Sequence, residues 1–158
     1  MNKMQNKFIE YAIDLAIENA KDVNGGPFGA VIVKDNKIVA TGVNLVTTNG
    51  DPTAHAEVMA IRNACKALET IDLSDCEIYA SCEPCPMCLG AIYWARLKAI
   101  YFAADRLEAA DAGFDDDHIY QEIPKDINDR KIKTIKLEHK NTMRPFEIWK
   151  ESDNKIEY

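Results

Sequence analysis

Two short stretches decide how this chain is interpreted: Thr53-Ala54-His55-Ala56-Glu57 and Pro84-Cys85-Pro86-Met87-Cys88. Imidazole and thiolate groups are the ligands that zinc prefers, and a structural zinc site normally closes with a fourth protein ligand. If His55, Cys85 and Cys88 hold one zinc ion per subunit, the fourth position stays open for water. An open position of this kind is typical of a catalytic site, so the two stretches predict an enzyme.

Glu57 lies outside this ligand set. A carboxylate beside an activated water can take the proton that the water releases. His-x-Glu followed by Pro-Cys-x-x-Cys is typical of zinc-dependent nucleobase deaminases. Two alternatives remain: Cys82 could close a structural Cys3His site, or the metal could serve only folding in a noncatalytic binding module, with Glu57 an ordinary helix residue.

Composition limits what else the chain can contain. Its 158 residues suit a single domain spanning residues 1–158, with no repeat or linker to divide it. No stretch is apolar and long enough for a membrane span or a signal peptide, and the odd number of five cysteines disfavours a disulfide framework. We therefore expect a cytoplasmic protein. A net charge of −7 disfavours nucleic acid as a partner and favours a small neutral substrate.

The hydrophobic pattern predicts helices that alternate with strands. Three helices are expected: one carries Phe8, Ala12, Leu15 and Ala16, a second starts near Thr53, and a third starts near Cys85. The predicted strands are residues 30–33, 38–40, 77–81, 99–103 and 132–137. The first two should form an antiparallel hairpin, 99–103 should be buried and 132–137 should be an edge strand. This alternation indicates a layered α/β sandwich.

The spacing within each motif restricts where its residues can lie. His55 and Glu57 are two positions apart, so they can converge only at the N-terminal tip of a helix. Cys85 and Cys88 are three positions apart and are neighbours on one helical turn, where a helix N-terminus also lowers thiol pKa values. The sequence therefore predicts two helix N-termini that meet at one zinc ion.

The chain resembles the cytidine deaminase superfamily, and within it the bacterial guanine deaminases. The residues that carry this resemblance are Gly25 to Ala30, Asn44, Asp51 to Glu57, Cys82 to Cys88, Ala91 to Arg96, Gly113 to Asp116 and Lys155 to Tyr158. The resemblance implies a three-layer α/β/α sandwich around a mixed five-stranded sheet. It also implies a homodimer in which a C-terminal segment, about residues 140–158, is exchanged between subunits.

The same resemblance implies roles for five further residues. Asn44 would bind a purine base, Phe28 and Trp94 would form apolar walls, and Tyr158 would reach the partner's site and shape substrate choice. Asp116 would accept hydrogen bonds from the donors of guanine and act as a second proton carrier. By composition alone, Asn44 could simply end a strand, the aromatic residues could be core, the acidic loop could be solvated and the tail could be disordered.

The reaction implied by the resemblance is the hydrolysis of guanine to xanthine and ammonia, a step of purine catabolism and salvage. Deamination of guanosine is an alternative, because one sequence does not show whether the pocket admits a ribose. Deamination of adenosine in transfer RNA shares the zinc motif, but the acidic composition disfavours an RNA substrate.

Overall fold

The structure is a computed structural model that describes residues 3–158. The chain divides into two compact units, Met1–Asp116 and Asp117–Tyr158, which are described separately. None of the helices in the described residues combines the length and the apolar character that a membrane span requires.

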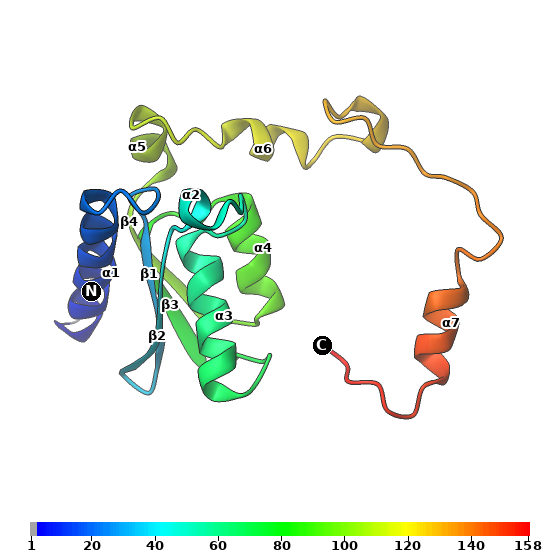
Figure 1. Ribbon diagram of the computed structural model, residues 1–158, viewed down its shortest axis with the longest axis horizontal. Helices are drawn as coiled ribbons and strands as arrows, with labels where there is room; N and C mark the ends of the chain where they lie inside the picture. Colours follow the sequence, from blue (N-terminus) through cyan, green and yellow to red (C-terminus); the bar gives the residue numbers. More distant parts are fainter. Residues whose placement is uncertain (1–2) are drawn as a thin grey trace. The chain divides into compact units, whose positions relative to one another are not determined.

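A mixed four-stranded sheet forms the centre of the first unit (Figure 1). Its strands are β1 (Gly29–Lys34), β2 (Lys37–Val43), β3 (Cys76–Cys82) and β4 (Ala99–Ala104), in the order β2-β1-β3-β4. β1 is antiparallel to both β2 and β3, whereas β3 and β4 are parallel. The α/β class and the mixed sheet are confirmed, but the prediction of five strands is wrong.

The hairpin between β1 and β2 follows the sequence prediction. Asp35 and Asn36 have φ values of 49° and 59°, both in the left-handed region. Asp and Asn tolerate this conformation better than most residues, and two successive residues with positive φ suit the twist of a two-residue hairpin. The local sequence therefore accounts for both the turn and the antiparallel pairing.

Helices cover both faces of the sheet. The helix α1 (Lys3–Lys21) lies on one face, and α3 (Ala56–Leu68) and α4 (Pro86–Trp94) lie on the other (Figure 1). Side chains of β1 alternate between the two cores, because Ile32 packs with the α3 and α4 cluster and Val31 packs with the α1 cluster. The unit is therefore a three-layer α/β/α sandwich, and its central strands are buried on both faces.

Two glycines let helices lie directly on the sheet. A Cβ atom at Gly29 would lie 2.4 Å from the carbonyl oxygen of Ala12 on α1. A Cβ atom at Gly42 would lie 2.2 Å from the carbonyl oxygen of Ala56, the first residue of α3. Only glycine permits so close an approach of two backbones. The contact at Gly42 therefore brings the N-terminus of α3, and His55 before it, close against β2.

The far edge of the sheet differs from the prediction. β4 was predicted to be buried, but it is the last strand in the sheet order, and Phe102 is 46% exposed. The short helix α5 (Arg106–Asp111) follows it and begins with a capping box between Asp105 and Glu108. A short helix α2 (Val46–Asn49) follows β2.

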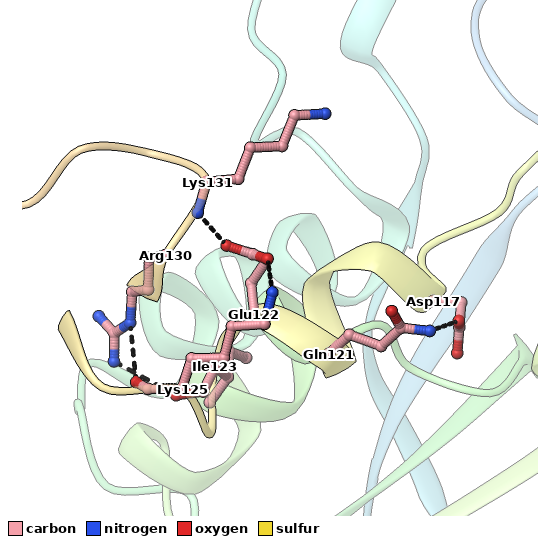
Figure 2. Close-up of polar contacts among 7 residues, drawn as sticks. All are labelled: Asp117, Gln121, Glu122, Ile123, Lys125, Arg130 and Lys131. Atoms are coloured by element: carbon pink, nitrogen blue, oxygen red, sulfur yellow. Dashed lines mark hydrogen bonds and ion pairs between the residues drawn. The ribbon is translucent and has the colours of Figure 1, made fainter. Parts of the chain in front are cut away.

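The second unit consists of short elements: α6 (Asp117–Glu122), a 3-10 helix (Ile127–Asp129) and α7 (Arg144–Glu151). Polar contacts hold the turn after α6 together (Figure 2). Glu122 pairs with Lys125 and accepts the backbone N–H of Lys131 at 2.6 Å, and the Arg130 guanidinium donates to the carbonyl oxygens of Ile123 and Lys125.

Residues 132–137 form no strand, which accounts for the missing fifth strand. A strand needs a neighbour to pair its backbone N–H and C=O groups, and the described second unit contains no other strand. The side chains of Ile132, Ile135 and Leu137 are exposed within the chain. The prediction that residues 132–137 form an edge strand is therefore wrong, although the segment does carry apolar side chains.

Candidate metal centre

Two helix N-termini present the predicted ligands, as the motif spacing requires. His55 is the N-cap residue of α3, and Cys85 is the N-cap residue of α4, in both cases with extended backbone and no capping hydrogen bond from the side chain. Pro86 at the start of α4 suits a helix N-terminus because its missing N–H would have no partner there. The side chains of His55 and Cys85 are therefore free of the capping role.

The side chains of His55, Cys85 and Cys88 converge, with their potential ligand atoms all within 4.8 Å of one another. The Nδ1 atom of His55 lies 3.6 Å from the Sγ atom of Cys85 and 3.5 Å from that of Cys88. Among the residues that the structure describes, His55, Cys85 and Cys88 are the His, Cys, Asp or Glu side chains that lie close enough together, in a group of three or more, to hold a metal ion.

These separations fit zinc. With bond lengths of about 2.0 Å to nitrogen and 2.3 Å to sulfur, tetrahedral angles place the two ligand atoms roughly 3.5 Å apart. The two observed distances from His55 Nδ1 to sulfur, 3.6 and 3.5 Å, agree with this value. One nitrogen and two sulfurs also form a donor set that zinc accepts, with a fourth position left for another ligand.

The two thiols differ in their attraction for a proton. The hydrogen bond from Cys88, together with His55, lowers the pKa of Cys85 to about 4. The same contact with Cys85 and burial raise the pKa of Cys88, and the neighbouring Glu57 adds to the effect. A bound cation would favour the thiolate form of both side chains.

Glu57 lies in the first turn of α3 and is only 7% exposed. Its Oε2 atom accepts a hydrogen bond from the Cys88 thiol at 3.4 Å, which places the carboxylate directly beside the cluster. Burial raises the pKa of Glu57. A raised pKa makes the carboxylate a better proton acceptor than a solvated one, which suits a group that must accept a proton and then release it.

Cys82 and Asp116 lie near the cluster without joining the convergent group. The Sγ atom of Cys82 lies 3.7 Å from the carbonyl oxygen of Asp105, and burial raises its pKa to about 11. Cys82 is the last residue of β3, and its thiol keeps its proton. Burial, and then the negative charge of Cys85, raises the pKa of Asp116, which is half-buried at the end of the first unit.

Asn44 and Phe28 lie on the same side of the first unit. The backbone N–H of Asn44 donates to the Phe28 carbonyl at 3.1 Å, and Leu45 N–H donates to the Ala54 carbonyl, next to His55, at 2.9 Å. Asn44 is 5% exposed. The ring of Phe28 packs edge-on against Phe114, with ring centroids 4.9 Å apart. These backbone hydrogen bonds join the segment after β2 to the segment before α3, so Asn44 and Phe28 lie near His55 in the fold.

Trp94 and Tyr158 are placed differently. Trp94 is the last residue of α4, and nine residues of helix separate it from Cys85 by about 13 Å along the axis. Its side chain is 67% exposed. Tyr158 ends the second unit and is exposed. The structure therefore does not bring Trp94 to the cluster of its own chain, and the roles of both residues stay predictions.

The sequence analysis assigns no role to two residues near this site. Asn19 lies on the buried stripe of α1 with Phe8, Ala12 and Ala16. A polar residue on an apolar stripe indicates a buried hydrogen bond, so the sequence does contain a signal for this residue. Phe114 packs on Phe28, but its neighbours Gly113 and Asp115 give no periodicity from which that contact could be inferred.

Comparison with known proteins agrees with this arrangement. Residues 2–104 match the family described as the cytidine and deoxycytidylate deaminase zinc-binding region. Guanine deaminase of Bacillus subtilis is 55% identical over 151 residues, which are 96% of this chain and 97% of that protein. A tRNA-specific adenosine deaminase of Aquifex aeolicus is 41% identical over 98 residues, which are 60% of this chain and 65% of that protein.

Solved structures give the same result. The X-ray structure of guanine deaminase from Bacillus subtilis matches with a TM-score of 0.95 and 54% identity, covering 100% of this chain and 99% of that chain. A structure of guanine deaminase from Nitrosomonas europaea matches with a TM-score of 0.64 and 32% identity, covering 77% of this chain and 66% of that one. This chain therefore belongs to the cytidine and deoxycytidylate deaminase family that this zinc-binding region defines, and it is similar to bacterial guanine deaminase along its whole length.

Proposed function

We propose that this protein is a zinc-dependent guanine deaminase that hydrolyses guanine to xanthine and ammonia. The observation that carries the proposal is the convergence of His55, Cys85 and Cys88 beside the buried carboxylate of Glu57. Similarity to a guanine deaminase over 96% of the chain supports guanine as the substrate. The two units would together form one deaminase domain, residues 1–158.

His55, Cys85 and Cys88 would hold one zinc ion per subunit, as their donor atoms and separations allow. The ion, when bound, supplies the Lewis acidity that makes water a nucleophile near neutral pH. The remaining steps depend on groups of the chain itself.

Glu57 would transfer the protons. Its carboxylate accepts a proton from the attacking water and delivers it to a ring nitrogen of guanine when the carbon–oxygen bond forms at C2. The same carboxylate then takes the proton of the new C2 hydroxyl and gives it to the exocyclic nitrogen, so that the carbon–nitrogen bond breaks, ammonia leaves and the C2 carbonyl of xanthine forms. Burial helps because it raises the pKa of Glu57, so that the protonated form survives long enough to donate.

Asn44, Phe28 and Asp116 would position the base. The carboxamide of Asn44 can hydrogen-bond the purine edge, and the ring of Phe28, held by Phe114, can contact its flat face. Asp116 would accept from N1–H and the exocyclic amine of guanine, and it would serve as a second proton carrier because burial raises its pKa. Trp94 and Tyr158 would complete the walls of the site.

The protein would act as a homodimer that exchanges its C-terminal segment, about residues 140–158. Apolar side chains in the second unit support this proposal, because Ile132, Leu137, Phe146 and Trp149 are exposed within a single chain. A free terminal segment seldom carries so many exposed apolar side chains, and a partner surface would cover them. Tyr158 would then reach the partner's site. Mass measurement by size-exclusion chromatography with light scattering tests the dimer.

Guanine turnover tests the proposed reaction. The loss of guanine absorbance is followed with the purified protein as isolated, after treatment with a chelator, and after zinc is restored. We expect turnover that disappears with the metal and returns with zinc. Guanosine and an adenosine-containing tRNA anticodon stem-loop are assayed in parallel, and preferential turnover of either would replace guanine as the substrate.

A further inference from the structure

Asn19 is a buried polar side chain that the proposed mechanism does not use. It lies on α1, is 5% exposed, and donates from Nδ2 to two backbone carbonyls, Gly26 at 2.8 Å and Asn44 at 2.9 Å. Seven and 25 residues separate it from these partners. One amide group therefore ties α1 to the glycine loop and to the residue proposed to bind the base.

The carboxamide of Asn44 has a defined orientation. Its Oδ1 atom accepts from the backbone N–H groups of Gly26 at 3.1 Å and Val46 at 3.2 Å. A backbone N–H can only donate, so the atom that faces both groups must be the oxygen and the NH2 group must point the other way. Asn44 can therefore offer only donors to a ligand.

This NH2 group reaches solvent. Within residues 3–158, Asn44 Nδ2 has no hydrogen-bond partner in the protein. Every fully buried side-chain nitrogen or oxygen of these residues does have a partner, so Asn44 Nδ2 cannot be fully buried. A donor in this position suits an acceptor on the edge of a purine, such as a ring nitrogen or the O6 oxygen. It would not suit a ring N–H, because two donors would then face each other.

The glycine loop lies directly against the backbone of Asn44. A Cβ atom at Gly25 would lie 2.0 Å from the Asn44 carbonyl oxygen, so the loop approaches as closely as glycine permits. Asn19 donates to that same carbonyl oxygen and to the carbonyl oxygen of the next residue, Gly26. The Gly26 N–H in turn holds Asn44 Oδ1. Asn19, Gly26 and Asn44 thus form a closed set of hydrogen bonds.

We propose that Asn19 is a positioning residue that determines the donor-only orientation of the Asn44 carboxamide and so contributes to selection of the purine edge. The proposal rests on the proposed function for the part that concerns guanine. Without the Asn19 amide, the Asn44 carbonyl loses its buried donor, the loop is held less tightly, and the Gly26 N–H no longer stays aligned with Asn44 Oδ1.

Kinetics of Asn19→Ala, Asn44→Ala and the double variant test this role. We expect Asn19→Ala to raise KM for guanine about tenfold with a smaller change in kcat. A hydrogen bond that holds the base contributes equally to binding of the substrate and of the transition state, so its loss appears in KM. In the Asn44→Ala background, Asn19→Ala should have no further effect on kcat/KM. A merely structural loss would instead multiply with the Asn44 effect.

Asn63→Ala is the matched control. Asn63 also donates from Nδ2 to a backbone carbonyl, that of Thr41 at 2.8 Å, but it lies on the exposed surface of α3. It should leave KM unchanged. Asn19→Ser is a milder second variant, since a hydroxyl can reach at most one of the two carbonyls, and it carries the kinetic test if Asn19→Ala does not fold. Kinetics of the folded Asn19 variant that equal those of the wild type, or additive effects with Asn44→Ala, would overturn the proposal.

Amide hydrogen exchange separates this proposal from the proposed function. The N–H groups of Gly26 and Val46, both held by Asn44 Oδ1, should exchange about tenfold faster or more in the folded Asn19 variant than in the wild type, whether or not guanine is the substrate. If the wild type does not deaminate guanine but these amides lose protection, only the proposed function fails. If guanine is deaminated but protection is unchanged, the role of Asn19 fails.

Discussion

The first unit buries Ile32, Ile78 and Tyr79 almost completely between the sheet and its helices, whereas the second unit leaves Ile132, Leu137 and Trp149 exposed. The first unit has a sheet on which apolar side chains from both faces find partners. The second has only short helices, and an isolated helix of eight residues such as α7 is marginal without packing. The comparison indicates that the first unit supplies its own stability and the second depends on a surface that it does not contain.

Replacing Glu57 with Gln should give the largest effect, and it would show that the first unit supplies the group that transfers protons. The change keeps the shape of the side chain but removes its ability to accept a proton, so kcat should fall about 10³-fold. Bound zinc and the unfolding temperature should change little. Glu18→Gln, an exposed carboxylate on α1, is the control. Wild-type kcat in Glu57→Gln would contradict the assignment.

Trp149→Ala tests whether the exposed apolar side chains of the second unit are covered by a partner. If α7 packs on another subunit, loss of this ring should weaken the dimer by about 2 kcal/mol, or roughly 30-fold in Kd. Light scattering over a dilution series gives this value. Lys150→Ala removes the next side chain of the same helix and should leave the dimer intact. A wild-type dissociation constant for Trp149→Ala would show that this residue does not lie in an interface.

A pair of glycine substitutions examines the packing of the first unit. At Gly42 a Cβ atom would meet the backbone of α3 at 2.2 Å, so Gly42→Ala should lower the free energy of unfolding by about 1–3 kcal/mol. Gly90 lies within α4 and has open space around it, so Gly90→Ala should raise the free energy of unfolding by up to about 1 kcal/mol. Urea unfolding measures both. Equal effects at the two sites would contradict close packing at Gly42.

Tyr79 gives the smallest expected effect, a pH dependence of stability. Burial, and then the hydrogen bond to Glu77, raises the pKa of its hydroxyl. The folded state therefore keeps this proton when the unfolded state loses it, and the associated stability is complete below pH 10 and declines above it. The free energy of unfolding of the wild type, relative to Tyr79→Phe, should fall by about 1 kcal/mol between pH 10 and pH 11. A constant difference would show that Tyr79 ionises freely in the folded state.

Much of the first unit was predictable because its elements have local causes. The Asp35-Asn36 turn, the buried stripe of α1 and the helix starts beside His55 and Cys85 all follow from spacing and residue type. The same reasoning failed at residues 132–137, because an apolar pattern shows that a segment needs a covering surface but does not say which surface. Strand pairing depends on a distant neighbour.

The sequence by itself determined the types of donor atom available to the candidate metal site, an imidazole and neighbouring thiols, but it left open whether Cys82 joins them; the fold brings His55, Cys85 and Cys88 together without Cys82. Only the tertiary structure decided how Glu57 is buried, how many strands form the sheet, and which way the Asn44 carboxamide points. The physical reason is range. Donor types and the spacing within one motif are local properties, whereas the convergence of His55 with Cys85 and Cys88 across 30 and 33 residues exists only in the folded chain. The same holds for the contact from Asn19 to Asn44 across 25 residues.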